Sequence, residues 1–343
     1  VALLTEEERK RIKGLIINKF RGDRSILEPG ISMLEDLCGI PVVGVVPYMD
    51  VDIEDEDSLS SRLETGKGKA PAAVDLAVIR FPRISNFTDF NVFSGIPGVS
   101  LRYVTRACDL GTPDMVILPG TKNTIHDLLW MRQNGLEAAI LKLADRRVPV
   151  WGICGGYQMM GEVLVDEKGV ESDLPSRTSG MGLLPLKTEF EEEKIRTQVE
   201  GAFGQLDGCL GGLSGKSIEG YEIHMGRTYI DREEGAADTA RIVPWRREPE
   251  ICRPMDYVME TGKDRLSSRQ ARMDGWNRGN IYGTYVHGIF DSPGIAGAVA
   301  EALAAAKGLC LEQAADMDYR TYRQQQYDKL AEELRKNLDM AAV

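Results

Sequence analysis

One stretch of this sequence, residues 148–161, constrains the fold more than any other. It reads Val-Pro-Val-Trp-Gly-Ile-Cys-Gly-Gly-Tyr-Gln-Met-Met-Gly. The apolar run before Cys154 predicts a buried strand, and a helical pattern begins directly after the cysteine. The neighbouring glycines predict a tight turn, since glycine tolerates backbone conformations that are closed to larger residues. The stretch therefore predicts a strand–turn–helix elbow that exposes Cys154 at the carboxyl edge of a sheet.

Cys154 at such an elbow is a candidate nucleophile. The start of the helix supplies backbone N–H groups and the positive end of the helix dipole, and both favour a thiolate. The same N–H groups could hold an oxyanion. The alternative is a buried structural cysteine, which is the commoner role of a lone cysteine. The flanking glycines and the polar Gln158, one turn later, favour the nucleophile.

Composition excludes several classes of protein. The net charge of −11 argues against a nucleic-acid partner, because phosphate binding needs a basic surface. No apolar stretch approaches the length of a membrane span and no signal peptide opens the chain, so we expect no membrane partner. The six cysteines are scattered, with no metal-ligand spacing, which predicts no metal site and favours a reducing cytoplasm.

Two α/β series follow one another along the chain. Residues 1–50 hold apolar runs at 14–19 and 42–47 around a helical pattern at 31–38, which predicts a βαβ unit. Residues 51–73 are acidic and polar and predict a linker. The second series, 74–309, predicts strands at 75–80, 100–105, 114–118, 148–153, 220–229 and 280–286, and helices at 124–145 and from Gln158 onwards. Residues 231–280 are predicted to be an elaborated loop region, and 310–343 a helical tail.

The three histidines differ in their suitability as a partner for Cys154. His287 ends a predicted strand, and a parallel sheet can bring it to the edge where Cys154 lies. There it could act as general base to the thiol and general acid to a leaving amine; the alternative is a half-buried structural histidine. His224 could line the same pocket, whereas His126 near a helix start is expected to be solvated. The loop at 119–120 ends a strand and could aim another N–H into the cleft.

Several motifs, in order along the chain, resemble one family. They are Leu-Pro-Gly-Thr-Lys-Asn-Thr at 118–124, Gly-Ile-Cys-Gly-Gly-Tyr-Gln-Met-Met-Gly at 152–161 and Gly-Thr-Tyr-Val-His-Gly-Ile-Phe at 283–290. Together they resemble the class I glutamine amidotransferases, in the branch of the cobyrinic and cobyric acid synthases of cobalamin biosynthesis. The segments 17–23, 80–90 and 220–227 point within that branch to the cobyric acid synthase family. The resemblance runs from about residue 14 to the tail.

The resemblance implies a fold and a set of roles. It implies a flavodoxin-like, parallel-sheet amidotransferase domain, preceded by the end of a P-loop-type α/β synthetase domain. Cys154 would attack the side-chain amide of glutamine and release ammonia, with His287 as its base. Gly120 and Gly155 match positions whose N–H groups form the oxyanion hole. The positions that match the glutamine pocket are Gln158, Tyr221, Glu222 and His224.

The resemblance also implies a second reaction that uses the ammonia. Members of the family use ATP and Mg²⁺ to amidate the b, d, e and g carboxylates of a corrinoid, adenosylcobyrinic acid a,c-diamide. A carboxylate is a poor acyl donor until it is phosphorylated. Asn18 and Lys19 would lie near the base of ATP, although they could simply form a strand-end turn. The basic candidates for corrinoid contacts are Arg80, Arg83 and Arg227.

Two departures from the family pattern matter. Many class I amidotransferases have a glutamate two residues after the histidine, but Ile289 stands there. We therefore expect a Cys–His dyad, with Asp291 as the weaker candidate for a third member. No GxxxxGK[ST] phosphate loop occurs, and the chain opens at Val1 with a helix already under way. We expect it to be a fragment that lacks an amino-terminal synthetase segment and cannot complete the amidation alone.

Other functions remain open from the sequence. The resemblance leaves room for a cobyrinic acid a,c-diamide synthase or an amidotransferase that acts on a cell-wall lipid. A non-catalytic ammonia-channel or regulatory module would keep the fold without the reaction, although the presence of Cys154 and His287 argues against it. A cysteine hydrolase on the same fold, acting on peptides or small carbonyls, is a further alternative.

Overall fold

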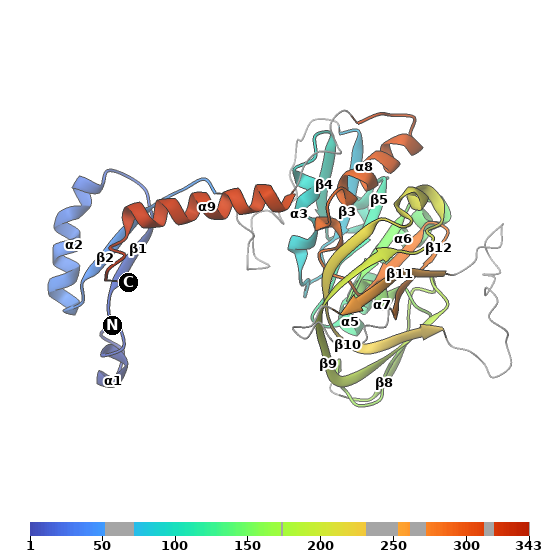
Figure 1. Ribbon diagram of the computed structural model, residues 1–343. Helices are drawn as coiled ribbons and strands as arrows, with labels where there is room; N and C mark the ends of the chain where they lie inside the picture. The colour runs from blue at the N-terminus through green and yellow to red at the C-terminus, as the bar shows by residue number, and fades with distance from the viewer. Residues whose placement is uncertain (52–71, 173, 231–252, 261–271, 312–318, 343) are drawn as a thin grey trace. The chain divides into compact units, whose positions relative to one another are not determined.

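The described residues of the computed structural model fall into two compact units (Figure 1). The described residues are 1–51, 72–172, 174–230, 253–260, 272–311 and 319–342. The first unit comprises Val1–Glu54 together with Arg320–Val343, and the second comprises Asp55–Tyr319. Because the second unit lies between the two segments of the first in sequence, the first unit is assembled from both ends of the chain.

The first unit is a small βαβ arrangement. Its elements are α1 (Glu6–Arg9), β1 (Leu15–Phe20), α2 (Arg24–Cys38), β2 (Val42–Pro47) and α9 (Tyr319–Asn337). β1 and β2 pair in parallel, as the apolar runs at 14–19 and 42–47 predict. α2 is longer than the predicted 31–38, because Asp23 caps it by accepting a hydrogen bond from the Ser25 N–H; Gly39 ends it in a left-handed conformation.

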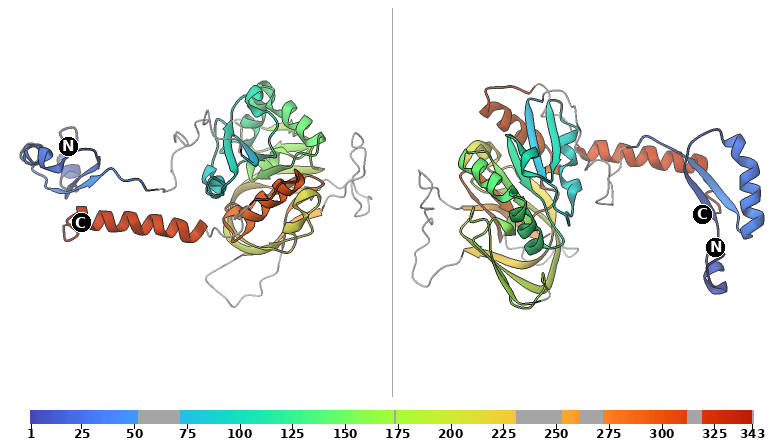
Figure 2. Two further views of the ribbon diagram at one scale, coloured as in Figure 1. Left: turned by 90° about the horizontal axis from the view of Figure 1, so that it is seen from above. Right: turned by 180° about the vertical axis from the view of Figure 1, so that it is seen from behind.

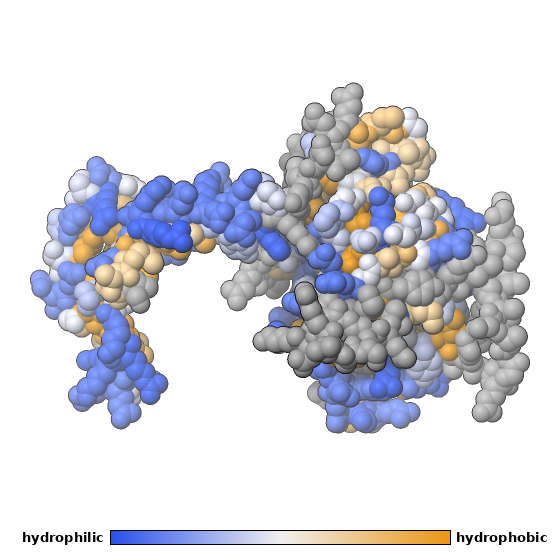
Figure 3. Space-filling model, in the orientation of Figure 1, coloured by the Kyte–Doolittle hydropathy of each residue, from blue (hydrophilic) through white to orange (hydrophobic). Residues whose placement is uncertain are grey.

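The carboxyl-terminal segment packs on this βαβ unit. Leu338 forms an antiparallel bridge with Gly44 of β2, and the Asp339 N–H donates to the Val43 carbonyl at 2.8 Å. Lys329 Nζ donates to the carbonyl of Asp50 at 2.7 Å. Within the 310–343 tail, Tyr319–Asn337 forms the helix that the sequence predicts, and from Arg320 onwards the tail belongs to the first unit. Figure 3 shows a largely hydrophilic surface along α9.

The second unit is built on one sheet whose parallel part carries the helices. The parallel strands run in the order β4-β3-β5-β6-β13, and antiparallel β12 and β11 continue the sheet towards β9, β7 and β8, with β10 paired to β9. The strands are β3 (Val74–Ile79), β4 (Val99–Val104), β5 (Met115–Leu118), β6 (Val150–Ile153), β7 (Val163–Asp166), β8 (Ser176–Ser179), β9 (Leu186–Phe203), β10 (Ser217–Ile230), β11 (Arg253–Glu260), β12 (Arg272–Arg278) and β13 (Ile281–Thr284).

Helices cover both faces of the parallel part, which buries its central strands on both sides. α5 and α6 lie on one face and α8 on the other, as the two views of Figure 2 show. β5 and β6 are buried along their whole length, and Trp151 of β6 packs against Tyr282 and Phe290. The helices are α3 (Asn91–Ser94), α4 (Ala107–Leu110), α5 (Thr124–Gln133), α6 (Leu136–Asp145), α7 (Gly155–Met159) and α8 (Ile295–Ala306), with 3-10 turns η2 (Phe87–Phe90), η3 (Gly208–Leu213) and η4 (Ile289–Asp291).

The predicted α/β class is confirmed, and the differences have local causes. The helix predicted at 124–145 is two helices, because Gly135 adopts a left-handed conformation between α5 and α6. The prediction of loops throughout 231–280 is wrong where β11 and β12 form; residues 231–252 and 261–271 lie outside the described residues. Strands β7, β8 and β9 were not predicted, since none of them has a long continuous apolar run.

Candidate active site

Cys154 occupies a sharp turn between β6 and α7. Its backbone has φ 51° and ψ −111°, a conformation that few residues other than glycine adopt. The Cys154 N–H donates to the carbonyl of Thr284 at 2.9 Å, which ties the turn to the end of β13. Gly156 permits the close approach of α7 to β5, because a Cβ there would lie 2.0 Å from the carbonyl oxygen of Leu118. The predicted strand–turn–helix elbow is therefore present.

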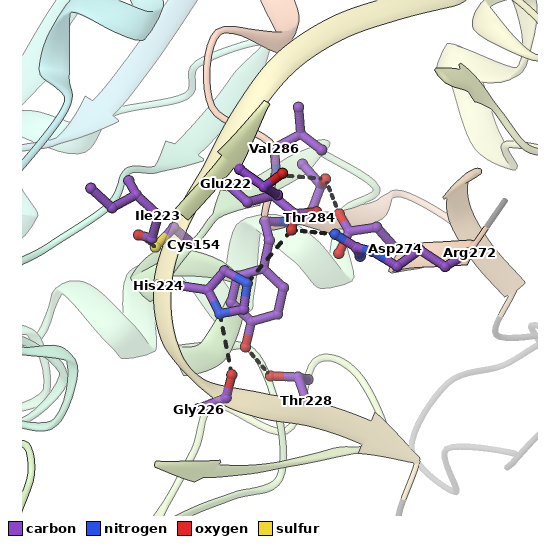
Figure 4. Close-up of polar contacts among 12 residues, drawn as sticks. Cys154, Glu222, Ile223, His224, Gly226, Thr228, Arg272, Asp274, Thr284 and Val286 are labelled. Carbon is purple, nitrogen blue, oxygen red and sulfur yellow. Dashed lines mark hydrogen bonds and ion pairs between the residues drawn. The ribbon is translucent and has the colours of Figure 1, made fainter. Parts of the chain in front are cut away.

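The thiol lies at the edge of the core, in contact with strand β10. The predicted exposure of Cys154 is wrong in this structure, because the residue is only 8% exposed; its Sγ donates to the carbonyl oxygen of Ile223 at 3.6 Å (Figure 4). Among the described cysteines, Cys108, Cys209 and Cys310 are exposed instead. Cys154 is thus the cysteine that the fold places beside other polar groups of the sheet edge.

His287 reaches the same edge from the neighbouring strand. β13 pairs in parallel with β6, Thr284 opposite Ile153, and His287 follows three residues after β13 ends. An antiparallel bridge to Tyr221 of β10 fixes its backbone, and the Tyr221 ring stacks on the imidazole with centroids 5.2 Å apart. The structure therefore brings together Cys154, His287 and Tyr221.

A carboxylate that the sequence analysis missed contacts His287. Nδ1 of His287 lies 2.6 Å from Oδ2 of Asp89, and both side chains are buried. Nε2 is buried and forms no hydrogen bond within the described residues. Asp89 stands in the 80–90 segment between Phe87 and Phe90, and a charge among buried aromatic residues is the signal that could have revealed it.

The charges around His287 favour its protonated form. Burial alone would lower the pKa of the imidazole, but the Asp89 carboxylate and the Cys154 side chain outweigh burial and raise this pKa to about 10. An imidazolium next to a thiol is the arrangement that activates a cysteine nucleophile.

Of the two candidate oxyanion-hole glycines, Gly120 belongs to the 119–124 loop and Gly155 packs against that loop. A Cβ at Gly120 would lie 3.0 Å from Cε1 of His287, so a larger residue there would press on the imidazole. Gly155 is the first residue of α7, where backbone N–H groups lack an intrahelical acceptor. A Cβ on Gly155 would lie 2.7 Å from Cγ2 of Thr121 in that loop. Both glycines are therefore near the elbow.

Gln158 uses most of its hydrogen-bonding capacity within the protein. Its Nε2 donates to the carbonyl of Met225 at 3.0 Å and to the Tyr285 hydroxyl at 3.1 Å, while its Oε1 accepts from Thr124 Oγ1 at 3.0 Å. An amide oxygen can accept two hydrogen bonds, and within the described residues Oε1 of Gln158 accepts one, from Thr124. The side chain links α7, α5 and β10.

Glu222, His224 and Asp274 are buried and form a charged cluster with Arg272, which is partly exposed (Figure 4). The Glu222 carboxylate pairs with Arg272 and lies 3.8 Å from Nε2 of His224. Burial would raise the pKa of Glu222, but His224 and Arg272 reverse this and lower it. Burial and the charge of Glu222 raise the pKa of Asp274, whose Oδ2 accepts from Thr284 Oγ1 at 2.6 Å. Oε1 of Glu222 is buried and has no hydrogen-bond partner within the described residues.

The remaining predicted site residues lie outside this centre. Asn18 and Lys19 are in the first unit, exposed at an irregularity of β1 where Lys19 has φ 55° and its N–H donates to Asn18 Oδ1. The side chain of His126 is 56% exposed, as expected for a solvated histidine. Of the basic corrinoid candidates, Arg227 pairs with Glu191 on the surface.

No group of three or more His, Cys, Asp or Glu side chains among the described residues could hold a metal ion. No helix within the same ranges is both long and apolar enough to cross a bilayer.

The fold and the site together define an α/β protein with a candidate cysteine nucleophile at a strand–helix elbow and a buried histidine beside it. Residues 75–295 match the family of CobB/CobQ-like glutamine amidotransferase domains, and the chain belongs to this family. The resemblance inferred from the motifs at 118–124, 152–161 and 283–290 is thereby confirmed.

Three similar bacterial proteins are named cobyric acid synthase. The cobyric acid synthase of Ruminiclostridium cellulolyticum is 49% identical over the whole chain, which covers 62% of that protein. Those of Lachnoclostridium phytofermentans and Photorhabdus laumondii are 46% and 43% identical, and the chain covers 64% and 63% of them. The chain thus spans less than two thirds of each relative. Among solved structures, PurLQS from Thermotoga maritima is a remote likeness, with a TM-score of 0.42 and 15% identity over 75% of this chain and 99% of that chain.

Proposed function

We propose that the second unit is a glutaminase that supplies ammonia for the amidation of corrinoid carboxylates, as in a cobyric acid synthase. The observation that carries the proposal is the convergence of Cys154 and His287 at one edge of the sheet, inside a glutamine amidotransferase domain. The relatives' name supplies the acceptor, and the motifs at 17–23, 80–90 and 220–227 favour it over the cell-wall-lipid alternative.

The first half of the reaction would form a thioester. Sγ of Cys154 attacks the side-chain carbonyl carbon of glutamine, and the C–N bond breaks when Nε2 of His287 delivers its proton to the leaving ammonia. The N–H groups of Gly120 and Gly155 would hold the oxyanion that develops on the carbonyl oxygen. The second half reverses the roles: His287 takes a proton from water, which attacks the thioester and releases glutamate.

Strand β10 and helix α7 would hold the glutamine. Tyr221 lies against His287, so its ring bounds the reacting centre. Glu222 and His224 are a carboxylate and an imidazole on the same strand, and the unpartnered Oε1 of Glu222 could accept a hydrogen bond from an ammonium group. Oε1 of Gln158, which accepts from Thr124, could accept a second hydrogen bond from an N–H of the substrate.

The whole protein would use the ammonia at a second site. ATP with Mg²⁺ would activate the corrinoid carboxylate there by phosphorylating it. This chain holds no GxxxxGK[ST] loop, so the phosphate-binding part would come from a synthetase segment outside these residues. Asn18 and Lys19, exposed in β1, are the candidates for contacts with the nucleotide base.

Glutamine hydrolysis by this chain tests the glutaminase half. We expect glutamate release, and covalent labelling of Cys154 by the glutamine analogue 6-diazo-5-oxo-L-norleucine, located by peptide mass spectrometry. Cys154→Ser should abolish both, whereas Cys108→Ser changes an exposed thiol and should alter neither. Glutamine hydrolysis that survives in Cys154→Ser would remove the nucleophile assignment.

ATP-dependent amidation tests the synthetase half. The complete coding sequence should give a protein that amidates a corrinoid a,c-diamide with glutamine, and Cys154→Ser in that protein should still use added ammonia. This chain alone should not amidate the corrinoid. Amidation by this chain would show that its residues suffice for ATP-dependent activation.

A further inference from the structure

The carboxylate beside His287 comes from an unexpected part of the chain. Ile289 occupies the position two residues after the histidine and is fully buried, so it supplies no charge. The carboxylate comes instead from Asp89, which lies 198 residues before His287 in the sequence. Its Oδ2 lies 2.6 Å from Nδ1, and Asp89 and His287 are 5% and 1% exposed.

Turn η2 fixes the position of Asp89. Asn86 has a left-handed backbone, with φ 51° and ψ 35°, and starts the turn. Phe87 and Phe90 on either side of Asp89 are buried, and the Phe90 ring contacts Phe290 of η4, three residues after His287. Because the aromatic residues anchor both η2 and η4, the carboxylate and the imidazole are held at a fixed separation.

Residues 85–86, just before η2, also form hydrogen bonds with two neighbours of the imidazole, Gly120 and Tyr221. The Ser85 N–H donates to the carbonyl of Gly120 at 2.9 Å, in the loop that adjoins the imidazole. Nδ2 of Asn86 donates to the hydroxyl of Tyr221 at 2.7 Å, and the Tyr221 ring stacks on the imidazole. Residues 85–89 therefore contact the imidazole directly and through two of its neighbours.

We propose that Asp89 is the positioning carboxylate of this centre, the third member in place of the acid that the family pattern has after the histidine. This deepens the proposed glutaminase function and rests on it. The carboxylate accepts the Nδ1–H hydrogen bond, which leaves Nε2 to face Cys154 and stabilises the imidazolium. During acylation the proton on Nε2 goes to ammonia, and during deacylation Nε2 takes one from water. Asp89 stays ionised throughout.

The titratable and charged groups on the elements around the imidazole come from η2, the elbow, β10 and β12. Asp89 is on η2, Cys154 on the elbow and Tyr221 on β10, while Glu222 on β10 pairs with Arg272 on β12. Burial lowers the pKa of His287, but Asp89 raises it most and Cys154 raises it further. This order agrees with the direct contact between Asp89 and Nδ1 of His287.

The test is the pH profile of Asp89→Asn, which keeps the size of the side chain and removes its charge. We expect kcat for glutamine hydrolysis to fall about 10²–10⁴-fold with little change in KM. The pH limb assigned to His287 in the rate of labelling by 6-diazo-5-oxo-L-norleucine should move down by two or more pH units. Asp89→Glu should restore part of kcat. Asp166→Asn removes another buried carboxylate, bonded to Val170, Glu171 and Ser172, and should leave the profile unmoved.

A measurement on the unsubstituted chain keeps the proposal testable if Asp89→Asn does not fold. The chain has three histidines, so its imidazole ¹H–¹⁵N signals can be assigned with His287→Asn. We expect a downfield Nδ1–H signal from His287 and a protonated ring at pH 8. A His287 that titrates near 6.5, or a folded Asp89→Asn with unchanged kcat and pH profile, would overturn the role of Asp89. Absence of glutamine hydrolysis and of labelling in the unsubstituted chain would instead overturn the proposed function.

Discussion

Cys154 keeps a backbone conformation that its side chain alone would disfavour. A residue with φ 51° and ψ −111° persists only when its surroundings hold it there. Two contacts do so: the hydrogen bond from its N–H to Thr284, and the packing of Gly156 against Leu118. The position of the thiol thus depends on the close packing of Gly156 against β5.

Gly156→Ala should break this support. The added Cβ would lie 2.0 Å from a backbone oxygen, so α7 must move away from β5. We expect the free energy of unfolding to fall by about 3 kcal/mol and the labelling of Cys154 to slow. Gly212→Ala is the control, because a Cβ there meets nothing within 4 Å. Equal unfolding free energies for the two variants would show that α7 does not depend on Gly156.

His287 should make stability depend on alkaline pH. Its pKa is raised from 6.5 to about 10, so its contribution is complete below about pH 6.5 and is lost as pH rises through 10. Between pH 7 and 9 the free energy of unfolding should fall by up to about 1.4 kcal/mol per pH unit relative to a variant with Asp89→Asn and His287→Asn. Both proteins should keep Cys154, because its side chain contributes to the raised pKa of His287. Tryptophan fluorescence can follow unfolding; parallel curves over this range would contradict the raised pKa.

At the scale of elements, helix α5 begins at the end of the 119–124 loop and depends on a partly buried carboxylate. Glu171 accepts a hydrogen bond from the Thr124 N–H at the first turn of α5, and its own carbonyl accepts one from Asn123 Nδ2 at 2.5 Å. Burial raises the pKa of Glu171 to about 7, despite the N–H groups of Thr124 and Ile125, which lower it. The start of α5 therefore contains a group that titrates near neutral pH.

Glu171→Gln should remove a stability loss that accompanies ionisation. A carboxyl group with a folded pKa of about 7 and an unfolded value of 4.5 stabilises the fold below pH 4.5, and that contribution disappears as pH rises to 7. The variant should gain up to about 3 kcal/mol relative to the unsubstituted chain between pH 4.5 and 8, because glutamine stays neutral and keeps an acceptor oxygen. Urea unfolding at both pH values measures this gain. Glu301→Gln, at an exposed position of α8, should show no such difference.

The sequence predicts best the strands that contain an uninterrupted run of apolar residues. The predicted strands at 75–80, 114–118 and 148–153 have apolar centres because both faces of the parallel sheet are covered. β12 lies in a stretch of mixed charge, and its burial depends on partners far along the chain, so no local pattern reveals it. No local pattern reveals Asp89 either, since a short 3-10 turn has no hydrophobic periodicity and its partner His287 is distant in sequence. The sequence predicts a dyad because Ile289 stands where the family pattern has an acid close to the histidine.

Across the whole molecule, the first unit takes segments from both ends of the chain, and the carboxyl-terminal segment extends its sheet. A pair of parallel strands is marginal alone, and β1 and β2 gain a third neighbour only when Leu338 and Asp339 join β2. A Cβ at Gly44 would lie 2.3 Å from Cδ2 of Leu338, which shows how closely this segment packs. The chain therefore completes the first unit only after the amidotransferase unit has been made.

Deletion of residues 320–343 should therefore damage the first unit and spare the second. Without Leu338 and Asp339, β2 loses its pairing on one side, and trypsin should cleave within residues 1–54 at least tenfold faster. Cys154 should still react with 6-diazo-5-oxo-L-norleucine at the rate of the full chain, because its partners lie in the second unit. Deletion of residues 340–343 is the control, since it keeps the Asp339–Val43 hydrogen bond. A first unit that resists trypsin without residues 320–343 would show that the carboxyl-terminal segment rests on it without supporting it.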